Sequence, residues 1–472
     1  MGISDWAVLD WLALVEHELL LFAGVFFLLG AIDEVIVDLL WLRLRVAGQH
    51  RTIQMPVADL PHRPLTGRAA VLIPAWQEEK VIEYTIAHAL KSWTQAELCI
   101  YVGCYRNDPA TVEAAARGAG FDPRVRLVIH DKHGPTTKAD CLNRLYVAME
   151  QDEGRTGEVA RMVLLHDAED MVAPPALSLL DKALELADFV QLPVLPMPHP
   201  KSRWIGSHYC EEFAEAHGKA MVVRDSLPGG IPAAGVGCAF SRDLLSALAR
   251  QSATRGPFCE HSLVEDYELG LRIAEAGGRS RFLRVRGPDR QLVATRAFFP
   301  SRLDHSVRQK ARWVHGIAFQ GWDRVGWGGS LAEWWMRGRD RRGPLAAVVL
   351  LAGYALLALA AVLWIAGLAG IAQPRQPGML LQILLWFNVA SFIWRAAMRF
   401  AFTSREYGWA EGVRAVFRIP LTNIIAIMAG RRALLAYIKS LFGARPAWDK
   451  TSHDAHPAQE RSVALQMVEA TR

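Results

Sequence analysis

Hydrophobic residues are unevenly distributed along this chain, with long apolar runs near both ends and short ones in a polar middle. Four short, mainly apolar runs lie between residues 69 and 165: 69–74 (AAVLIP), 98–103 (LCIYVG), 125–129 (VRLVI) and 162–165 (MVLL). Such runs between polar flanks are typical of strands buried on both faces of a parallel sheet. Helical patterns separate them, at 81–93, 112–118 and 138–149. This alternation predicts a mostly parallel, doubly wound α/β sheet.

Two further segments extend the predicted sheet. Residues 189–194 (FVQLPV) are expected to be extended, and residues 233–240 (AAGVGCAF) to form a strand punctuated by Gly235 and Gly237. Glycine inside a strand marks either a close approach of backbone to a ligand or a tight turn, and the pattern leaves both open.

The stretch RMVLLHDAED, residues 161–170, ends in three carboxylates, Asp167, Glu169 and Asp170. Ligands of open α/β sheets bind at the carboxyl ends of the strands. If the backbone is still extended there, Asp167 and Glu169 point to the same side and can bind one hard cation. The alternative is a polar turn after a core strand.

Polar side chains also gather at two predicted helices. Glu265 and Asp266 open one of them, where carboxylates often interact only with the helix dipole. The run RQKARW, residues 308–313, predicts another helix, on which Gln309 and Arg312 are three apart and share a face. The chain has no GxGxxG after the first strand and no Walker A sequence, so a metal and basic side chains would have to hold any diphosphate.

The amino-terminal apolar run, residues 19–32, covers only about 21 Å as a helix, less than the roughly 30 Å of a bilayer core. A transmembrane helix there must continue through Asp33, Glu34 and Asp38, with these acids facing protein or water. The alternative is an interfacial amphipathic helix. Arg43, Arg45 and Arg51 follow, so the positive-inside rule predicts residue 1 outside and the next region in the cytosol.

Two more apolar runs predict a transmembrane hairpin. Residues 345–371 lack any charge, and residues 379–394 follow a short loop at 373–377. Arg395 and Arg399 are expected to snorkel to the interface. Residues 419–442 are apolar but interrupted by Pro420 and by basic residues, which predicts an amphipathic helix on the cytosolic surface. If this helix spans the membrane instead, the chain from residue 443 lies outside.

These patterns divide the chain into a transmembrane helix (1–45), a cytosolic α/β domain (46–340), a transmembrane hairpin (341–400), and interfacial helices with a cytosolic tail (401–472). The net charge of +5 is modest for 472 residues and does not argue for nucleic acid as a partner. Six cysteines without a C-x-x-C or Cys/His pattern exclude an evident zinc or redox motif and are typical of a reducing compartment.

Several motifs occur in a fixed order along the middle of the chain. They are IPAWQEE at 73–79, the polar strand end at Asp108, K-x-x-x-x-N at 138–143, D-x-E at 167–169, Glu265-Asp266, and Q-x-x-R-W at 309–313. In this order they resemble the processive, membrane-bound glycosyltransferases of family 2, which include cellulose and hyaluronan synthases. The sequences FFP at 298–300, QKARWVHGIAFQGW at 309–322 and WDKTSHD at 448–454 are similar to the phage-adsorption-protein-B type of inner-membrane glycosyltransferase.

The resemblance implies a GT-A fold, a nucleotide-sugar donor that is usually UDP-linked, and inversion at the anomeric carbon. It implies that Glu78 and Asp108 contact the base and ribose of the donor and that Lys138 lies near the nucleotide. Solvated polarity at strand ends is the alternative for these three. Asp167 and Glu169 would hold Mg²⁺ or Mn²⁺ against the diphosphate. The family usually has Asp at the second position, so Asp170 could replace Glu169.

The resemblance also assigns the acceptor side. Asp266 is the candidate general base, which must come within about 3 Å of the attacking hydroxyl, and Glu265 positions its loop beside the acceptor. Gln309 and Arg312 would bind the diphosphate, because the planar fork of Arg suits phosphate oxygens. Trp313 offers a flat face for an acceptor sugar, the alternative being an interfacial or core aromatic.

Together these features predict an inverting enzyme of the bacterial inner membrane with a cytosolic catalytic domain. It would move a sugar from a UDP-sugar to a growing polysaccharide that is exported across the lipid bilayer. Three spans make a narrow channel, so a second copy or an export or outer-membrane partner protein is a further expectation. One alternative is transfer of a single sugar to a polyprenyl phosphate lipid carrier. Another is a non-catalytic receptor or scaffold, against which the joint presence of Asp167, Asp266 and Arg312 argues.

Overall fold

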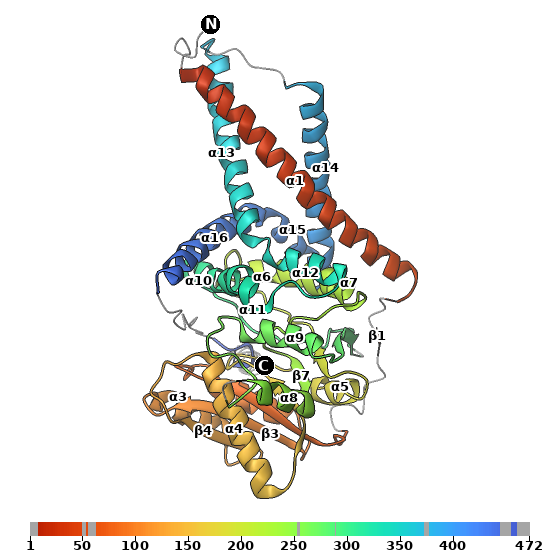
Figure 1. Ribbon diagram of the computed structural model, residues 1–472, viewed down its shortest axis with the longest axis vertical. Coiled ribbons are helices and arrows are strands. Elements are labelled where there is room, and N and C mark those ends of the chain that lie inside the picture. The colour runs from red at the N-terminus through yellow and green to blue at the C-terminus, as the bar shows by residue number, and fades with distance from the viewer. Residues whose placement is uncertain are drawn as a thin grey trace, which may run out of the picture.

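The computed structural model describes residues 8–49, 53–54, 63–252, 255–287, 289–371, 377–443 and 455–459. Three tiers follow one another along the longest axis of the molecule: membrane helices, a layer of shorter helices, and an α/β domain (Figure 1). Arg51, the loop before residue 377, the WDKTSHD motif and residues 460–472 lie outside the described residues.

The α/β domain is built on a sheet of seven strands in the order β4-β3-β2-β5-β7-β6-β8. The strands are β2 (Arg68–Pro74), β3 (Leu98–Tyr105), β4 (Val125–His130), β5 (Ala160–Leu165), β6 (Phe189–Gln191), β7 (Cys238–Ser241) and β8 (Ser280–Phe282). The first four are mutually parallel, while β7 runs antiparallel to both of its neighbours. The prediction of a mostly parallel sheet is therefore confirmed.

Alternate residues of β2 enter two different cores, which explains its unbroken apolar sequence. Ala69, Val71 and Ile73 pack toward α2 (Ile82–Ser92), α3 (Pro109–Ala119) and α5 (Ala176–Ala183). Ala70 and Leu72 pack on the opposite face, toward α4 (Lys138–Thr156), α8 (Arg242–Gln251) and α9 (Glu265–Glu275). A strand covered by helices on both sides has no position left for a polar residue.

The prediction of a strand at residues 233–240 is wrong for residues 233–237, because only residues 238–240 belong to β7, Cys238–Ser241. Gly235 and Gly237 have φ of 74° and 60°, values that place them in a turn outside any strand. β8 and the pair β1 (Ile53–Gln54) and β9 (Val285–Arg286) were not predicted, since two or three residues carry no detectable periodicity.

Short helices separate this domain from the membrane helices (Figure 1). They are α6 (His208–Glu215), η3 (Ala216–Ala220), α7 (Met221–Asp225), α10 (Leu303–Val314), η4 (His315–Gln320), α11 (Gly321–Val325), α12 (Leu331–Arg341) and α15 (Trp409–Phe417). Two of them, η3 and η4, are π-helical segments that continue α6 and α10.

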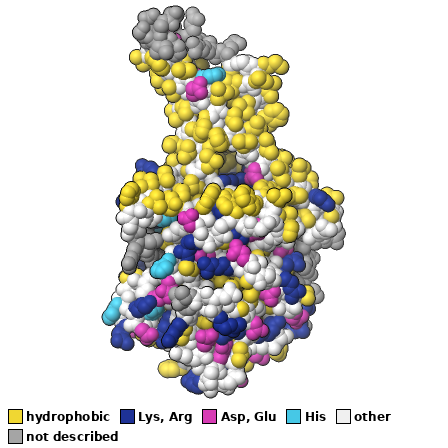
Figure 2. Space-filling model, in the orientation of Figure 1, with side chains coloured by type: hydrophobic (Ala, Val, Ile, Leu, Met, Phe, Trp, Pro, Cys, Tyr) yellow, Lys and Arg dark blue, Asp and Glu magenta, His cyan; other side chains and the backbone are white. Residues whose placement is uncertain are grey.

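Three long helices, α1 (Val8–Val46), α13 (Gly343–Leu368) and α14 (Met379–Tyr407), form the upper tier. With α16 (Ile419–Leu441) they are the four helices, among those described, that are long and apolar enough to cross a membrane. Figure 2 shows hydrophobic side chains over this tier and in a band beneath it, with charged side chains concentrated below.

The acidic residues of α1 face protein, as predicted. Asp38 Oδ1 accepts a hydrogen bond from Lys219 Nζ at 2.6 Å, and Asp33 Oδ1 accepts one from Trp335 Nε1 at 2.7 Å. Arg395 does not snorkel, because it forms 2.9 Å ion pairs with Glu34 and Glu215. Its partners on α1 and α6 hold it between the membrane helices and the lower domain.

The helix α16 packs against α10 through a contact of small residues, Ala429 and Ala433 against Ala311. Arg431 and Arg432 point to the exposed side. Pro420 does not interrupt the helix, because it occupies the first turn, where no backbone N–H is needed. Whether α16 lies on the membrane or crosses it stays a prediction.

Candidate functional site

The polar side chains at the ends of β2, β3 and β5 lie at one edge of the sheet, because these strands are adjacent and parallel. Asp108 follows β3 and occupies the N-cap position of α3 without a side-chain capping hydrogen bond, and Asp167 follows β5 after a single histidine. The carboxyl edge is where ligands of such sheets bind, so the structure groups the predicted residues where a site is expected.

Lys138 lies at the centre of a charged cluster. It occupies the first turn of α4, whose start is fixed by Thr137, the side chain of which accepts a hydrogen bond from Asp140 N at 3.1 Å. Lys138 Nζ lies 2.6 Å from Asp167 Oδ1 and 3.9 Å from Glu265 Oε1. We call Lys138, Asp167, Glu265, Asp266 and Arg312 the Lys138 cluster.

The surroundings of the cluster shift the pKa values of two of its carboxyl groups, Glu265 and Asp266. Burial and, after it, the negative charge of the neighbouring Asp266 raise the pKa of Glu265 to about 7. Burial also raises the pKa of Asp266, although Lys138 opposes this. Burial disfavours a charged lysine, yet Asp167, Glu265 and Asp266 outweigh it and raise the pKa of Lys138. The cluster therefore combines a cation with two carboxyl groups whose pKa values are raised, a shift toward the range that suits a general base.

Backbone contacts hold Asp266 in place. Its Oδ1 accepts a hydrogen bond from Tyr267 N at 2.7 Å, and its Oδ2 faces Gly235, where a Cβ atom would clash with it. At Gly237 a Cβ would clash with Thr295. Of the two interpretations of these glycines, the structure shows a tight turn, and at Gly235 this turn brings backbone against the candidate base.

The three acids after β5 have different orientations. Asp167 and Glu169 are half-exposed, whereas Asp170 is buried. Asp170 Oδ2 lies 2.8 Å from His166 Nδ1 and accepts a hydrogen bond from Asp167 N at 2.9 Å. Because the Asp170 carboxylate is buried and bound to His166 and Asp167 N, Asp167 and Glu169 are the two acids exposed enough to reach a cation.

A divalent cation fits this pair. Carboxylate oxygens are the ligands that Mg²⁺ and Mn²⁺ prefer. Within the described residues no group of three or more His, Cys, Asp or Glu side chains is arranged to hold a metal. A cation bound by Asp167 and Glu169 would therefore take its other ligands from water and from an anionic substrate.

Glu78 and Asp108 form a second group, joined to each other through the turn after β2. Asp108 Oδ2 accepts a hydrogen bond from Gln77 N at 2.6 Å, and Glu78 N donates one to Thr111 Oγ1 at 2.9 Å. Gln77 has a φ of 55°, a conformation that costs energy for a residue with a side chain. The structure therefore shapes this turn around two buried carboxylates.

The helix α10 contributes Arg312 to the Lys138 cluster, where its charge opposes the raised pKa of Glu265. Gln309 Oε1 and Arg312 Nε are buried and have no hydrogen-bond partner within the described part of the chain. Trp313 is half-exposed, and its ring centroid lies 6.1 Å from that of Tyr209 and 6.4 Å from that of Phe213. It packs against the apolar cluster of Val264, Tyr267, Leu271 and Val325, while part of its surface stays exposed.

Three features of the site were missed. The pairing of His166 with Asp170 follows from a histidine four residues before an acid, a weak signal that the sequence does carry. The clash that Gly235 avoids depends on α9, thirty residues later. The contact of His456 Nε2 with Asp170 O, at 3.3 Å, comes from the far end of the chain and has no local signal.

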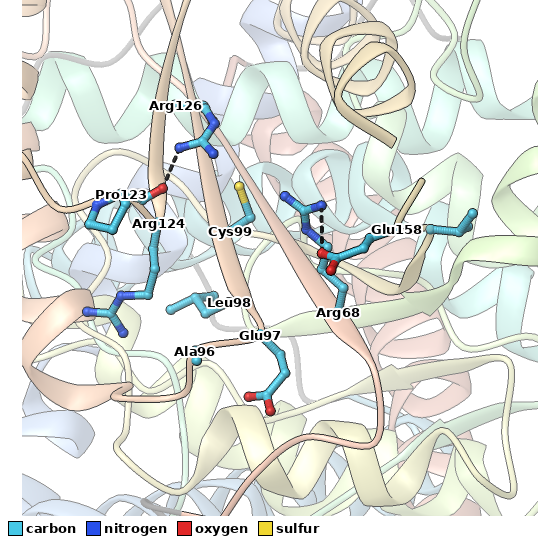
Figure 3. A pocket seen from close by; sticks show the side chains of 10 residues that line it. Arg68, Ala96, Glu97, Leu98, Cys99, Pro123, Arg124, Arg126 and Glu158 are labelled. Atoms are coloured by element: carbon cyan, nitrogen blue, oxygen red, sulfur yellow. Dashed lines mark hydrogen bonds and ion pairs between the residues drawn. The ribbon is translucent and has the colours of Figure 1, made fainter. Parts of the chain in front are cut away.

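A cleft of about 550 Å³ opens at the other edge of the sheet, where β2, β3 and β4 begin (Figure 3). Arg68, Arg124 and Arg126 line it, together with Glu97 and Glu158. Its arginines are already paired: Arg68 lies 3.3 Å from Asp152, Arg124 lies 2.8 Å from Asp122, and Arg126 lies 3.6 Å from Asp152. The candidate site is therefore the Lys138 cluster at the carboxyl edge.

Comparisons with known proteins agree with this geometry. Residues 67–316 match the model of a family described as "Glycosyltransferase like family 2". Bacteriophage adsorption protein B of Escherichia coli K12 and bacteriophage N4 adsorption protein B of E. coli O157:H7 are each 32% identical to this chain over 486 residues. The match covers 95% of this chain and 64% of each relative.

Among solved structures, the mannosyltransferase PcManGT from Pyrobaculum calidifontis, in complex with GDP-Man and Mn²⁺, matches with a TM-score of 0.50 at 18% identity. The match covers 86% of this chain and 99% of that chain. At this level of identity the likeness shows a shared fold alone.

Proposed function

Since the chain belongs to the glycosyltransferases of family 2, we propose that its Lys138 cluster transfers a sugar from a UDP-sugar to a growing polysaccharide, with inversion at the anomeric carbon. The chain is a glycosyltransferase with a GT-A fold and apolar helices suited to a membrane. The donor base, the acceptor and the individual residue roles are the content of the proposal. The observation that carries it is the meeting of Lys138, Asp167, Glu265 and Asp266 at the carboxyl edge of the sheet.

The donor would lie across two neighbouring strand ends. Glu78 and Asp108 would contact its base and ribose, and Lys138 would lie beside the diphosphate. Gln309 and Arg312 would bind the phosphate oxygens or their hydrogen-bonded water. A buried donor and a buried acceptor, Arg312 Nε and Gln309 Oε1, have no hydrogen-bond partner among the described residues, which supports a polar ligand at this place.

Charge balance supports a metal-dependent reaction. Asp167, Glu265 and Asp266 already outnumber the cations Lys138 and Arg312. A diphosphate would be repelled from such a site unless a cation came with it. Mg²⁺ or Mn²⁺ held by Asp167 and Glu169 would neutralise the charge that develops on the leaving diphosphate.

Asp266 would act as the general base. The acceptor hydroxyl gives its proton to the carboxylate as its oxygen attacks the anomeric carbon from the face opposite the diphosphate, so the configuration inverts. Glu265 would hold the loop, and burial raises the pKa of Asp266, which makes its carboxylate a stronger base. Trp313 would offer the exposed part of its ring to an acceptor sugar.

We assign the catalytic domain to the cytosolic side of a bacterial inner membrane. Arg339 and Arg342 pair with Asp33 and Glu34 of α1 at the junction between the membrane helices and the layer of shorter helices. This agrees with basic residues on the cytosolic side. A polysaccharide acceptor would leave toward the membrane helices, with a second copy or an export partner completing its path.

A lipid carrier is the second candidate acceptor. The helix α16 exposes Leu434, Leu435 and Ile438 while packing on α10, which carries Arg312. A polyprenyl phosphate held in the bilayer would find the site within reach of this apolar surface.

The experiment that tests the proposal measures release of the nucleoside diphosphate by purified protein in detergent. UDP-sugars and GDP-sugars are supplied with Mg²⁺ or Mn²⁺, with and without added oligosaccharide or polyprenyl phosphate. Turnover of one UDP-sugar, lost in Asp266→Asn, supports the proposal, and dependence on polyprenyl phosphate selects the lipid carrier. Absence of nucleotide binding to the wild type with either metal contradicts it.

A further inference from the structure

A short segment of the carboxy-terminal tail, residues 455–459, lies against the α/β domain far from α16, the last helix before it. His456 is fully buried and Pro457 is buried beside it. The His456 ring is stacked on Tyr84 of α2, with centroids 6.3 Å apart and an angle of 17° between the planes. A residue from the end of the chain is thus built into the domain that carries the site.

The hydrogen bonds of His456 fix the position of its proton. Ala458 N donates to His456 Nδ1 at 3.1 Å, so Nδ1 is an acceptor. The hydrogen of the neutral ring is then on Nε2, which donates to the backbone carbonyl of Asp170 at 3.3 Å. Burial lowers the pKa of His456 to about 4, so the ring is neutral at neutral pH.

The Asp170 carbonyl belongs to the loop that presents Asp167 and Glu169. Other elements hold the neighbouring carbonyls of this loop: Thr85 Oγ1 donates to Ala168 O at 2.5 Å, and Arg296 N donates to Met171 O at 3.0 Å. Inside the loop, Asp170 N donates to Asp167 O at 3.3 Å. Buried carbonyls need partners, and His456 supplies the one at Asp170.

We propose that His456 is a positioning residue of the transferase site. Through it, the tail segment 455–459 fixes the position of the loop that carries Asp167 and Glu169. This role rests on the proposed function, because it assumes that these two acids hold a cation. Two histidines hold Asp170 from different sides. His166 contacts its carboxylate, and His456 from the tail contacts its backbone carbonyl. Without the tail, the loop keeps the contact of Asp170 with His166 and loses the hydrogen bond from His456.

The test uses the full chain in detergent with three variants. His456→Ala removes the donor, His456→Gln restores an N–H donor on a flexible side chain, and Gln459→Ala is the matched control in the same tail segment. The first readout is hydrogen–deuterium exchange in peptides covering residues 166–172, where the amides of Asp167, Asp170 and Met171 are hydrogen-bonded. The second is the affinity for Mn²⁺ in the presence of excess UDP.

We expect His456→Ala to speed exchange in residues 166–172 by about tenfold, with β2 and β3 unchanged. We also expect the Mn²⁺ affinity to weaken by about tenfold, the low end for residues that support a metal ligand. His456→Gln should recover most of both effects, and Gln459→Ala should show neither.

Unchanged exchange and Mn²⁺ affinity in His456→Ala would overturn the inference, and so would exchange that rises throughout the sheet, since the effect would then be global unfolding. If wild type binds neither Mn²⁺ nor UDP, the proposed function fails. The exchange readout needs no ligand, so local loosening by His456→Ala would still establish the contact in that case.

Discussion

Two lysines of this protein, Lys138 and Lys219, have similar partners and different surroundings. Lys138, at the sheet edge, lies 2.6 Å from Asp167, and Lys219, beneath the membrane helices, lies 2.6 Å from Asp38. Lys219 has two further carboxylates, Glu215 at 2.8 Å and Glu34 at 3.5 Å. By pair chemistry alone the two sites would be judged equivalent.

Their surroundings separate them. The acids around Lys219 are shared with basic residues on other helices, namely Arg339, Arg342 and Arg395. In the Lys138 cluster the carboxylates outnumber the cations, Glu265 has a pKa of about 7, and the side chain of Asp167 is 32% exposed. The ion pairs around Lys219 balance one another in charge and join helices. The Lys138 cluster has more carboxylates than cations and is partly exposed, so it can receive a cation and a substrate.

The largest effect is expected from Asp266→Asn. Removal of the general base should reduce sugar transfer by about 10²–10⁴-fold, while UDP binding persists. The measurement is initial rate of nucleoside diphosphate release. Asp304→Asn, an exposed position on α10, is the control and should keep the wild-type rate. A rate in Asp266→Asn above one tenth of wild type would assign the base elsewhere.

Lys219→Met tests the opposite side of the comparison. It leaves buried carboxylates without their lysine, which should lower the free energy of unfolding by about 3 kcal/mol. The readout is the midpoint of thermal unfolding in detergent, with the exposed Lys182→Met as control. Loss of UDP binding in a folded Lys219→Met protein would show that the two clusters are not separate in role.

Glu169→Gln and Asp170→Asn distinguish the outward acid from the inward one. Because Glu169 is half-exposed beside Asp167, its replacement should weaken Mn²⁺ affinity by at least about tenfold. Asp170→Asn removes the charge next to His166 and should mainly lower thermal stability. Titration of Mn²⁺ by calorimetry checks both, with the exposed Glu158→Gln as control. A stronger loss of Mn²⁺ affinity in Asp170→Asn would reverse the assignment.

The smallest expected effect concerns pH. Asp266 must be ionised to act as base, and burial raises its pKa, so transfer should increase as pH rises through the raised pKa of Asp266. Lys138, Arg312 and Asp167 face the same carboxyl group. Glu265→Gln removes one negative charge, lowers the pKa of Asp266, and should move the ascending limb of kcat/KM to lower pH by up to about one unit. A shift to higher pH would contradict this coupling.

The sequence predicted the parts of the fold that follow local rules. The strands β2 to β5 were predicted because each is a mainly apolar run between polar ends. The extension of α1 through Glu34 and Asp38 was predicted because the apolar run alone is too short for a bilayer, and the inward orientation of these acids because charges are too costly to face lipid. β8 and β9 were missed, since strands of two or three residues form only where the sheet already exists.

For the site, the strand-end rule placed Asp108 and Asp167 at one edge, and the family resemblance added Lys138, Asp266 and Arg312. The inward orientation of Asp170, the clash that Gly235 avoids and the return of His456 were not predicted. Each depends on segments that meet only after folding, so no local pattern encodes it.

The most direct test of the central claim, that the open Lys138 cluster binds a nucleotide together with a cation, is calorimetric binding of UDP to the wild-type protein and to Asp167→Asn, with Mn²⁺ or with EDTA. We predict binding to wild type only when Mn²⁺ is present, and binding weakened by at least about tenfold in Asp167→Asn. Equal UDP affinity in EDTA, or in Asp167→Asn, would contradict the account.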